Sequence, residues 1–380
     1  MKVLMVATWY SPKDAPVMTA GVFHYEQSMA LKPYCETALY FPYDSTLTVP
    51  FEKNEERGLI TYRRKNASSP IPGAAGILRD IHLYRDLKKI CAEFHPDVIH
   101  AHCVYMTGAV VTAFGRHHNI PVVITEHNPM EQLPVGSRVK HKIMNWAYGH
   151  SDANVCVSIN SMERLQEQFP GCQYQVIYNG VYDPSTIPQD GKKDRVDGKI
   201  NCCIVAAFYS KTIKGYQYLL PAMAELKKMG RDIVLHVCGG GEYFEYYVNL
   251  AKQLDIEDCV IFHGNCSKAQ VYSIVSQMDF NISASLYECS GVSVEEALLL
   301  GKPMLVTRSG GANSLCTEEN AIVVDKGSTK ALVDGILAMT EKLPQFSKEK
   351  IYDYAFHNFE IDQVSQQYRN LYRSVLEKQK

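Results

Sequence analysis

The sequence lacks the segments that would carry a chain into or across a membrane. Its first residues, MKVLMVATWYS, have neither the long apolar core nor the cleavage site of a secretory signal peptide, and instead predict a buried first strand. No apolar run approaches the roughly 20 residues that a membrane-spanning helix needs. We therefore expect a cytoplasmic protein.

An excess of charge of one sign is also missing. The 39 Lys and Arg residues nearly balance the 41 Asp and Glu residues, which gives a formal net charge of −2 at pH 7. Proteins that bind nucleic acid usually carry a basic field or a basic face. The balance therefore predicts no nucleic-acid partner.

The twelve cysteines lack the spacing of a metal site. No two of them form a C-x-x-C pair, and several lie in apolar segments, among them Cys156, Cys202 and Cys238. Buried, reduced thiols are the expectation for such positions, rather than a disulfide framework or a zinc site. We predict no bound metal.

What the sequence does have is a regular alternation of short apolar runs and amphipathic stretches. Its 380 residues, 46% apolar and 21% charged, suit a globular protein of two domains. The β-α alternation in both halves predicts an α/β fold with two Rossmann-like, doubly wound domains. Ligands of such folds bind at the carboxyl edge of the sheet, and the cleft between two such lobes is the expected site.

One stretch, residues 279–315, concentrates polar groups at such an edge. A strand is predicted from Phe280 to Ala284, a helix from about Val292 to Leu300 and a second strand from Met304 to Thr307. The loops that follow the two strands, the second containing Gly310-Gly311, would meet at the carboxyl edge. We therefore place the site here.

Two carboxylates in this stretch are eight residues apart. Glu288 lies in the loop and Glu296 about one and a half turns inside the helix, so the two cannot share one helical face. They would contact different parts of an elongated ligand, and Glu296 suits a diol such as a ribose. Spacing alone leaves a second interpretation open, in which Glu295 and Glu296 are solvated helix residues and Glu288 is a loop charge.

Between these carboxylates the chain enters a helix, whose first N–H groups have no intrahelical partner. Such a terminus binds anions and suits phosphate. The N–H groups in question belong to Ser290, Gly291, Val292 and Ser293.

The stretch resembles the E-x7-E signature of the retaining family 4 glycosyltransferases of the GT-B fold. The signature typically reads E-x-F-G, four residues, E-A, then G-x-P and a GG loop. Ser290 stands where the family usually has an aromatic residue. The positions in register are Glu288, Gly291, Glu296, Ala297, Gly301, Pro303, Gly310 and Gly311.

The resemblance implies further donor-binding positions. Lys214 matches the lysine of an R-x4-K-G segment, where it would neutralise the diphosphate, but Tyr209 stands in place of the arginine. Lys211 is a candidate substitute for that arginine. The loop of Gly264 and Asn265 matches the one that borders the nucleobase.

Three positions in the first half of the chain also match. Gly21 lies in the loop that reaches toward the donor phosphate and the acceptor in the family. His102 and His127 end two neighbouring predicted strands. A lone histidine is usually structural, but two at adjacent strand ends favour a site. The resemblance places His127 beside the donor hexose and His102 on the acceptor side.

Residues 137–151 predict an amphipathic helix with a basic end. One interpretation is an ordinary core-facing helix with a solvated basic end. The other is peripheral contact with the inner face of the membrane, which the resemblance to enzymes with lipid-linked acceptors implies.

The resemblance also sets the expected domains. The Asn179-Gly180-Val181 segment resembles the entry to the interdomain hinge, and the last helix resembles one that crosses back onto the first domain. We expect an acceptor-side domain of residues 1–180 with about 360–380, and a donor domain of residues 181–359.

The predicted function is a retaining, metal-independent glycosyltransferase with no cofactor. A nucleotide sugar, by family usage a UDP-sugar, would be the donor, and a glycan or lipid-linked molecule of a surface polysaccharide or glycoconjugate pathway the acceptor. Glu288, His127 and Lys214 would carry the chemistry. Two alternatives stay open: a non-catalytic sugar-nucleotide binder, and another GT-B enzyme such as a sugar-nucleotide epimerase or a phosphorylase.

Overall fold

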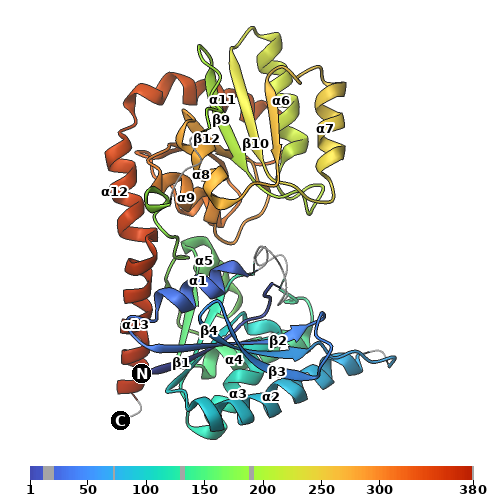
Figure 1. Cartoon of the computed structure of the whole chain (residues 1–380), viewed down its shortest axis with the longest axis vertical. Coiled ribbons are helices and arrows are strands. Elements are labelled where there is room, and N and C mark those ends of the chain that lie inside the picture. The colour runs from blue at the N-terminus through green and yellow to red at the C-terminus, as the bar shows by residue number, and fades with distance from the viewer. Residues whose placement is uncertain (12–20, 72, 129–132, 188–191, 379–380) are drawn as a thin grey trace. The chain divides into compact units, whose positions relative to one another are not determined.

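The computed structural model describes residues 1–11, 21–71, 73–128, 133–187 and 192–378. They form two compact units (Figure 1): unit 1 comprises Met1–Gly180 and Ile361–Lys380, and unit 2 comprises Val181–Glu360. Each unit has a mainly parallel sheet with helices against it, which confirms the predicted α/β class with two Rossmann-like domains. The last helix, α13 (Ile361–Glu377), belongs to unit 1, as the predicted fold requires.

Unit 1 contains an eight-stranded sheet in the order β3-β4-β2-β1-β5-β6-β7-β8. All neighbours are parallel except β3 and β4, which form an antiparallel hairpin. The strands are β1 (Lys2–Val6), β2 (Glu36–Asp44), β3 (Phe51–Glu56), β4 (Leu59–Lys65), β5 (Val98–His102), β6 (Val122–Glu126), β7 (Ala153–Cys156) and β8 (Gln175–Val176).

Helices and short turns connect these strands. They are α1 (Val22–Ala30), α2 (Ala74–Phe94), the kinked turn η1 (Val104–Gly108), α3 (Ala109–His118), α4 (Arg138–His150) and α5 (Ile159–Gln168). Because β2 and β5 flank β1 on opposite sides, the connections after β1 and after β5 diverge. The carboxyl edge beside β1 is therefore the switch point of this sheet, where ligands of such folds bind.

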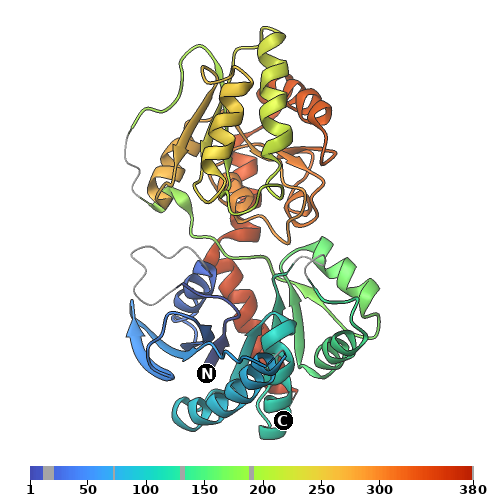
Figure 2. The ribbon, with the colours of Figure 1, turned by 90° about the vertical axis from the view of Figure 1, so that its right-hand side faces the viewer.

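Helix α13 packs against the sheet of unit 1, as Figures 1 and 2 show. Its apolar stripe includes Val364 and Val375, which join a buried cluster with residues of β1, β5, β6 and β7. The hydroxyl of Tyr372 shares a 2.7 Å hydrogen bond with Nδ1 of His100 on β5. The helix is thus fixed both by apolar burial and by a buried polar contact.

Unit 2 contains a six-stranded, wholly parallel sheet in the order β11-β10-β9-β12-β13-β14. Its switch point lies between β9 and β12, because β10 and β12 flank β9 on opposite sides. The strands are β9 (Ile200–Val205), β10 (Ile233–Cys238), β11 (Val260–Gly264), β12 (Phe280–Ser283), β13 (Met304–Thr307) and β14 (Ala321–Val324).

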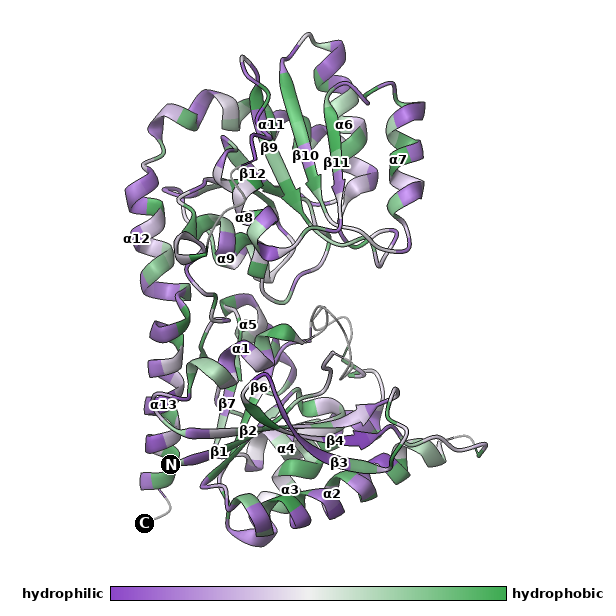
Figure 3. Ribbon diagram, viewed as in Figure 1, coloured by the Kyte–Doolittle hydropathy of each residue, from purple (hydrophilic) through white to green (hydrophobic). Residues whose placement is uncertain are grey.

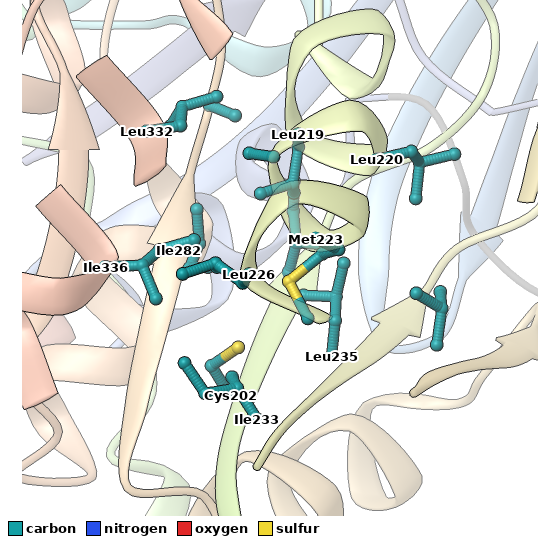
Figure 4. Close-up of a cluster of buried hydrophobic side chains, with 14 of the residues drawn as sticks. Cys202, Leu219, Leu220, Met223, Leu226, Ile233, Leu235, Ile282, Leu332 and Ile336 are labelled. Carbon is teal, nitrogen blue, oxygen red and sulfur yellow. The ribbon is translucent and has the colours of Figure 1, made fainter. Parts of the chain in front are cut away.

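The helices of unit 2 cover this sheet. They are η3 (Pro184–Thr186), α6 (Tyr216–Lys228), α7 (Phe244–Gln253), α8 (Lys268–Ser276), α9 (Val292–Leu299), α10 (Gly311–Ser314), α11 (Thr329–Lys342), η4 (Leu343–Gln345) and α12 (Lys348–Phe359). Strands β9 and β10 are mainly hydrophobic, whereas α7 alternates hydrophobic and hydrophilic residues (Figure 3). Leu219 and Leu226 of α6 pack in one buried cluster with strand residues such as Ile282 (Figure 4).

Some elements differ from the sequence-based expectation. Strand β2 and helix α3 were not predicted, and Gly310-Gly311 opens the short helix α10 rather than only a tight loop. Shortly before β9, the backbone N–H groups of Asp194 and Val196 donate to the side chains of Gln277 and Asn201. Within the described ranges, no helix is both long and apolar enough to cross a membrane.

The His100–Tyr372 contact yields a stability prediction. Tyr372→Phe leaves a buried imidazole nitrogen without its partner, at a cost of about 1–3 kcal/mol. We expect amide exchange in α13 to accelerate about 5- to 150-fold, measured by hydrogen–deuterium exchange mass spectrometry. Tyr246→Phe, which changes a half-exposed ring in unit 2, is the matched control. Equal α13 exchange in Tyr372→Phe and wild type would show that the His100–Tyr372 hydrogen bond does not stabilise the docking of α13.

Candidate functional site

Lys214 and Glu288 meet at the switch point of unit 2. Lys214 lies in the loop between β9 and α6, and Glu288 in the loop between β12 and α9. Lys214 Nζ is 2.5 Å from Glu288 Oε1, and the hydroxyl of Ser285 donates to the same oxygen at 2.8 Å. The side chains of Lys214 and Glu288 are 30% and 21% exposed, so both reach the surface of the edge. The structure brings these two predicted residues together.

Glycines allow these loops to approach so closely. Gly215 has a φ of +74°, and a Cβ there would lie 1.9 Å from the backbone oxygen of Ala284. A Cβ on Gly311 would lie 2.1 Å from the backbone of Cys289. Any larger residue would push the loops apart, because real Cβ atoms do not approach backbone so closely.

The backbone of Glu288 is also fixed. Its N–H donates to the Ser309 carbonyl at 3.0 Å, and its carbonyl accepts from Gly311 N–H at 2.7 Å. The loop that carries Glu288 is thereby joined to the loop that follows β13. The position of the carboxylate thus depends on backbone pairing as well as on side-chain contacts.

Helix α9 begins beside this pair. Gly291 is its N-cap, and its carbonyl accepts from the N–H groups of Val294 and Glu295 at 2.7 and 3.0 Å. Helix geometry leaves the N–H groups of Val292 and Ser293 without intrahelical partners, which makes this terminus suitable for an anion. The expected anion site therefore lies on the same loop as Glu288.

Glu296 lies one turn inside α9 and faces α8. Its Oε1 accepts a 2.7 Å hydrogen bond from the hydroxyl of Tyr272 and lies 4.0 Å from Lys268 Nζ. The side chain of Glu296 is 13% exposed. These contacts fix the direction of the carboxylate.

Glu295 is not the solvated helix residue that one interpretation of the spacing allowed. It is fully buried, and burial raises the pKa of its carboxyl group to about 8. The hydroxyl of Ser290 donates to its Oε1 at 2.9 Å. Ser290, at the position where the family usually has an aromatic residue, thus pairs with a buried acid. The sequence analysis missed this pair because glutamate in a helix usually indicates an exposed face.

The other donor-side residues lie on the same edge of unit 2. Lys211 Nζ lies 4.2 Å from the ring centre of Tyr246, so this ammonium group is directed toward an aromatic face. Gly264 ends β11 with a φ of +67°. Asn265 follows it and lies so near the loop after β10 that a Cβ on Gly240 would be 2.3 Å from Asn265 Oδ1.

In unit 1, Gly21 and three histidines lie at the switch-point edge. Gly21 is the N-cap of α1 with a φ of +62°, and a Cβ there would be 2.3 Å from the Trp9 carbonyl oxygen. His102 ends β5 and His127 follows β6, and His102 Nδ1 and His127 Nε2 share a 2.8 Å hydrogen bond. His24 of α1 joins them, with its ring centre 4.2 Å from that of His102. In the sequence, the signal that could have identified His24 as a site residue is its position in the first helical turn after Gly21.

Burial keeps these imidazoles neutral. Desolvation lowers the pKa of His127 to about 3 and holds the pKa values of His24 and His102 well below their ordinary range. Neighbouring imidazoles add to the lowering for His24 and His102. The cluster can therefore donate and accept hydrogen bonds without carrying charge.

Glu126 positions the backbone next to His127. Its Oε1 accepts from the N–H groups of His127 and Asn128 at 3.1 and 2.9 Å. Its Oε2 accepts from Val104 N–H at 3.0 Å and from the Tyr148 hydroxyl at 2.9 Å. All four of these bonds lie within unit 1, so Glu126 fixes the backbone conformation at the carboxyl edge of its sheet.

Helix α4, predicted over residues 137–151, has two apolar sides. Met144 and Tyr148 face the core, as the first interpretation expected. Val139, Ile143 and Trp146 are instead exposed, by 68%, 47% and 37%. The last two, with Lys142, line a cavity of about 570 Å³ that residues of α2 and α3 also line.

Comparison with known proteins identifies the family. The model described as Glycosyl transferases group 1 matches residues 188–355, and the model described as Glycosyltransferase Family 4 matches residues 43–183. Alpha-monoglucosyldiacylglycerol synthase of Streptococcus pneumoniae is 24% identical over 302 residues, which cover 73% of this chain and 68% of that protein. N-acetyl-alpha-D-glucosaminyl L-malate synthase of Bacillus anthracis is 21% identical over 311 residues, covering 78% and 80%.

Solved structures share the fold over nearly the whole chain. Sucrose-phosphate synthase of Thermosynechococcus elongatus superposes with a TM-score of 0.80 at 16% identity and 99% coverage of both chains. HepE of Anabaena in complex with UDP superposes with a TM-score of 0.73 at 19% identity, covering 98% of this chain and 100% of its own. With the GT-B fold and the two family models that together match more than half of its length, the chain belongs to the group 1, family 4 glycosyltransferases.

Proposed function

We propose that this glycosyltransferase moves a sugar from a nucleoside-diphosphate donor with retention of anomeric configuration and without a metal at the diphosphate. The observation that carries the proposal is the Lys214–Glu288 pair beside the N-terminus of α9, at the switch point of unit 2. A cation, a carboxylate and backbone N–H groups suit a ligand that has both a diphosphate and hydroxyl groups.

The diphosphate would bind between Lys214 and the first N–H groups of α9. Transfer breaks the bond between the anomeric carbon and the diphosphate oxygen, so negative charge grows on the leaving group. A lysine and helix N–H groups that already point at this charge stabilise the transition state. This role needs no divalent cation and no cofactor.

The two carboxylates divide the remaining contacts. Glu296, held by Tyr272, would accept hydrogen bonds from the ribose hydroxyls. Glu288 would accept from the sugar hydroxyls or stabilise positive charge on the anomeric carbon. Because Glu288 pairs with Lys214, donor binding would exchange this ion pair for contacts to the ligand. Gly264, Asn265 and Lys211 lie on the same edge as candidates for the nucleoside and diphosphate ends.

The family resemblance favours front-face transfer. The new bond from acceptor oxygen to anomeric carbon forms on the face from which the diphosphate departs, and the acceptor proton passes to a diphosphate oxygen. We assign His127 to hydrogen bonding with the transferred hexose, and His102 and Gly21 to the acceptor side, as the family resemblance implies. Neutral imidazoles suit hydroxyl groups because they can donate or accept.

UDP is the proposed nucleotide. The support is that HepE of Anabaena, which shares the fold, has been solved with UDP and with UDP-glucose. The proposed acceptor is a glycan or lipid-linked molecule of a surface polysaccharide or glycoconjugate pathway. One relative bears the name of a glucosyldiacylglycerol synthase, whose product is a lipid.

A lipid-linked acceptor accords with the exposed side of α4. Its outward apolar residues, Val139, Ile143 and Trp146, lie among exposed Arg138 and Lys142. Ile77 and Ile81 of α2 are exposed as well, and Ile81 lines the same cavity as Trp146. An apolar surface with basic residues binds anionic membrane interfaces. We propose peripheral contact with such a membrane through this face.

Nucleotide binding tests the donor site. We expect UDP, more than GDP, ADP or CMP, to raise the melting temperature, and EDTA to leave this shift unchanged. Glu296→Ala should lower UDP affinity about 10-fold or more, because hydrogen bonds to charged groups contribute about 1.5–3 kcal/mol. Glu257→Ala, an exposed carboxylate in the turn before β11, is the control. A UDP shift abolished by EDTA, or unchanged in Glu296→Ala, would refute this donor site.

Turnover tests the chemistry and separates an enzyme from a binder. With UDP-glucose and no acceptor, slow hydrolysis should release glucose whose α-anomer predominates in early proton NMR spectra. Lys214→Met should reduce the release of UDP about 10²- to 10³-fold, since one charge-stabilising group is lost. Lys228→Met, at an exposed position at the end of α6, should behave as wild type. Tight UDP binding without any turnover, in all donors tried, would favour the non-catalytic alternative.

The two tryptophans make membrane contact measurable. Trp9→Phe leaves Trp146 as the sole tryptophan, whose emission should shift to shorter wavelength with vesicles that contain anionic lipid. In this background, Val139→Ser with Ile143→Ser should weaken vesicle binding about 10-fold or more, because each buried side chain contributes about 1.5–3 kcal/mol. Met229→Ser changes a similarly exposed residue of unit 2 and is the control. Equal vesicle binding by the Val139→Ser, Ile143→Ser variant and the Met229→Ser control would show that this face of α4 does not contact the membrane.

A further inference from the structure

Three histidines of unit 1 converge from three elements on one point. His24 comes from α1, His102 from the end of β5 and His127 from the residue after β6. One ring nitrogen from each lies within 4.8 Å of the other two. Among the residues that the structure describes, this is the group of histidine, cysteine and acidic side chains whose geometry suits a metal ion.

Two of these rings carry nitrogen atoms without hydrogen-bond partners. His24 and His102 are both fully buried. Among the described residues, neither ring nitrogen of His24 has a partner, nor does Nε2 of His102. Buried polar atoms are nearly always paired, and an unpaired one costs about 1–3 kcal/mol. A cluster that served packing alone would not need imidazoles at these positions.

The neighbouring polar groups are already engaged. His100 stacks on His102, but its two nitrogens bond to Tyr372 and Thr125, each at 2.7 Å. The carboxylate of Glu126 bonds to backbone N–H groups and to the Tyr148 hydroxyl. Among the residues that the structure describes, the three imidazoles therefore remain as the candidate metal ligands.

We propose that His24, His102 and His127 form a binding site for one divalent transition-metal ion, with Zn²⁺ as the best-suited ion. Three imidazoles with a fourth, exchangeable ligand are an established zinc environment. Zinc–nitrogen distances of about 2.0–2.1 Å place ligand nitrogens about 3.4 Å apart, so ring nitrogens that now lie within 4.8 Å of one another need move only on the order of 1 Å. The ion would enter beside His127, the partly exposed member.

Metal binding would inhibit transfer, an inference that rests on the proposed function. A nitrogen of His127 that binds zinc cannot also bond to a sugar hydroxyl. The metal would thus occupy a group that the donor hexose needs, whereas the diphosphate site in unit 2 would be untouched. Zinc should slow UDP-glucose turnover, EDTA should restore it, and UDP affinity should stay the same.

The test uses the full chain after EDTA treatment and its removal. Titration with Co²⁺ should produce visible d–d absorption that saturates at one ion per chain and disappears when Zn²⁺ is added. His24→Gln should lower Co²⁺ affinity about 100-fold or more, since loss of a ligand exceeds the effect of losing its supporting contacts. His95→Gln, an exposed histidine between α2 and β5, should bind Co²⁺ as wild type does.

Folding and activity are checked separately from metal binding. His24→Gln should retain its UDP-induced melting shift, and His127→Gln provides a second ligand variant if His24→Gln does not fold. No absorption in wild type, or equal binding by wild type and both ligand variants, would overturn the site. Saturable Co²⁺ binding with no effect of zinc on UDP-glucose turnover would support the metal site but refute the proposed inhibition of transfer through His127. Failure of UDP to bind anywhere would refute the proposed function and leave the cobalt result unaffected.

Discussion

Parallel pairing on both sides of a central strand determines where each unit can bind a ligand. In unit 2, β9 lies between β10 and β12, so the loops after β9 and β12 leave the sheet in opposite directions. The space between them is the one place on this edge that neither connection crosses. Lys214 and Glu288 come from those two loops. In unit 1 the same arrangement around β1 places His102 and its neighbours at the corresponding edge. Both sites are therefore consequences of strand order.

Close backbone contact turns this general position into a defined geometry. Without a side chain at Gly215 or Gly311, the loops of unit 2 touch each other through main-chain atoms. Lys214 and Glu288 then meet because their backbones are fixed, rather than because long side chains find each other in solvent. For the proposed transfer this would matter, since a charge-stabilising group contributes most when it needs no reorganisation during the reaction. It also explains why a partly exposed ion pair, weak in itself, is maintained here.

Periodicity and strand-end position predicted most of this arrangement, because both are local properties of the sequence. They found the two α/β domains, the helix from Val292 and the polar ends of β5 and β6. They did not find β2 or α3, because short apolar runs do not by their periodicity alone distinguish a strand from a helix. Nor could they show that Glu295 is buried, because its burial depends on a partner, Ser290, and on the packing of α9. Pattern likewise does not reveal that, among the described residues, both ring nitrogens of His24 and Nε2 of His102 lack hydrogen-bond partners, since that depends on every neighbour at once.

The two edges differ in charge, and this difference bears on what each can bind. The edge of unit 2 has an ammonium group, carboxylates and helix N–H groups, which suit a charged diphosphate. The edge of unit 1 has imidazoles that burial keeps neutral, which suit uncharged hydroxyl groups. Neutral imidazole is also the form that binds transition metals. A neutral cluster that would suit sugar hydroxyl groups at physiological pH would therefore also suit zinc under the same conditions. Sugar and metal would compete for the imidazole of His127, so selectivity would depend on the supply of each rather than on pH.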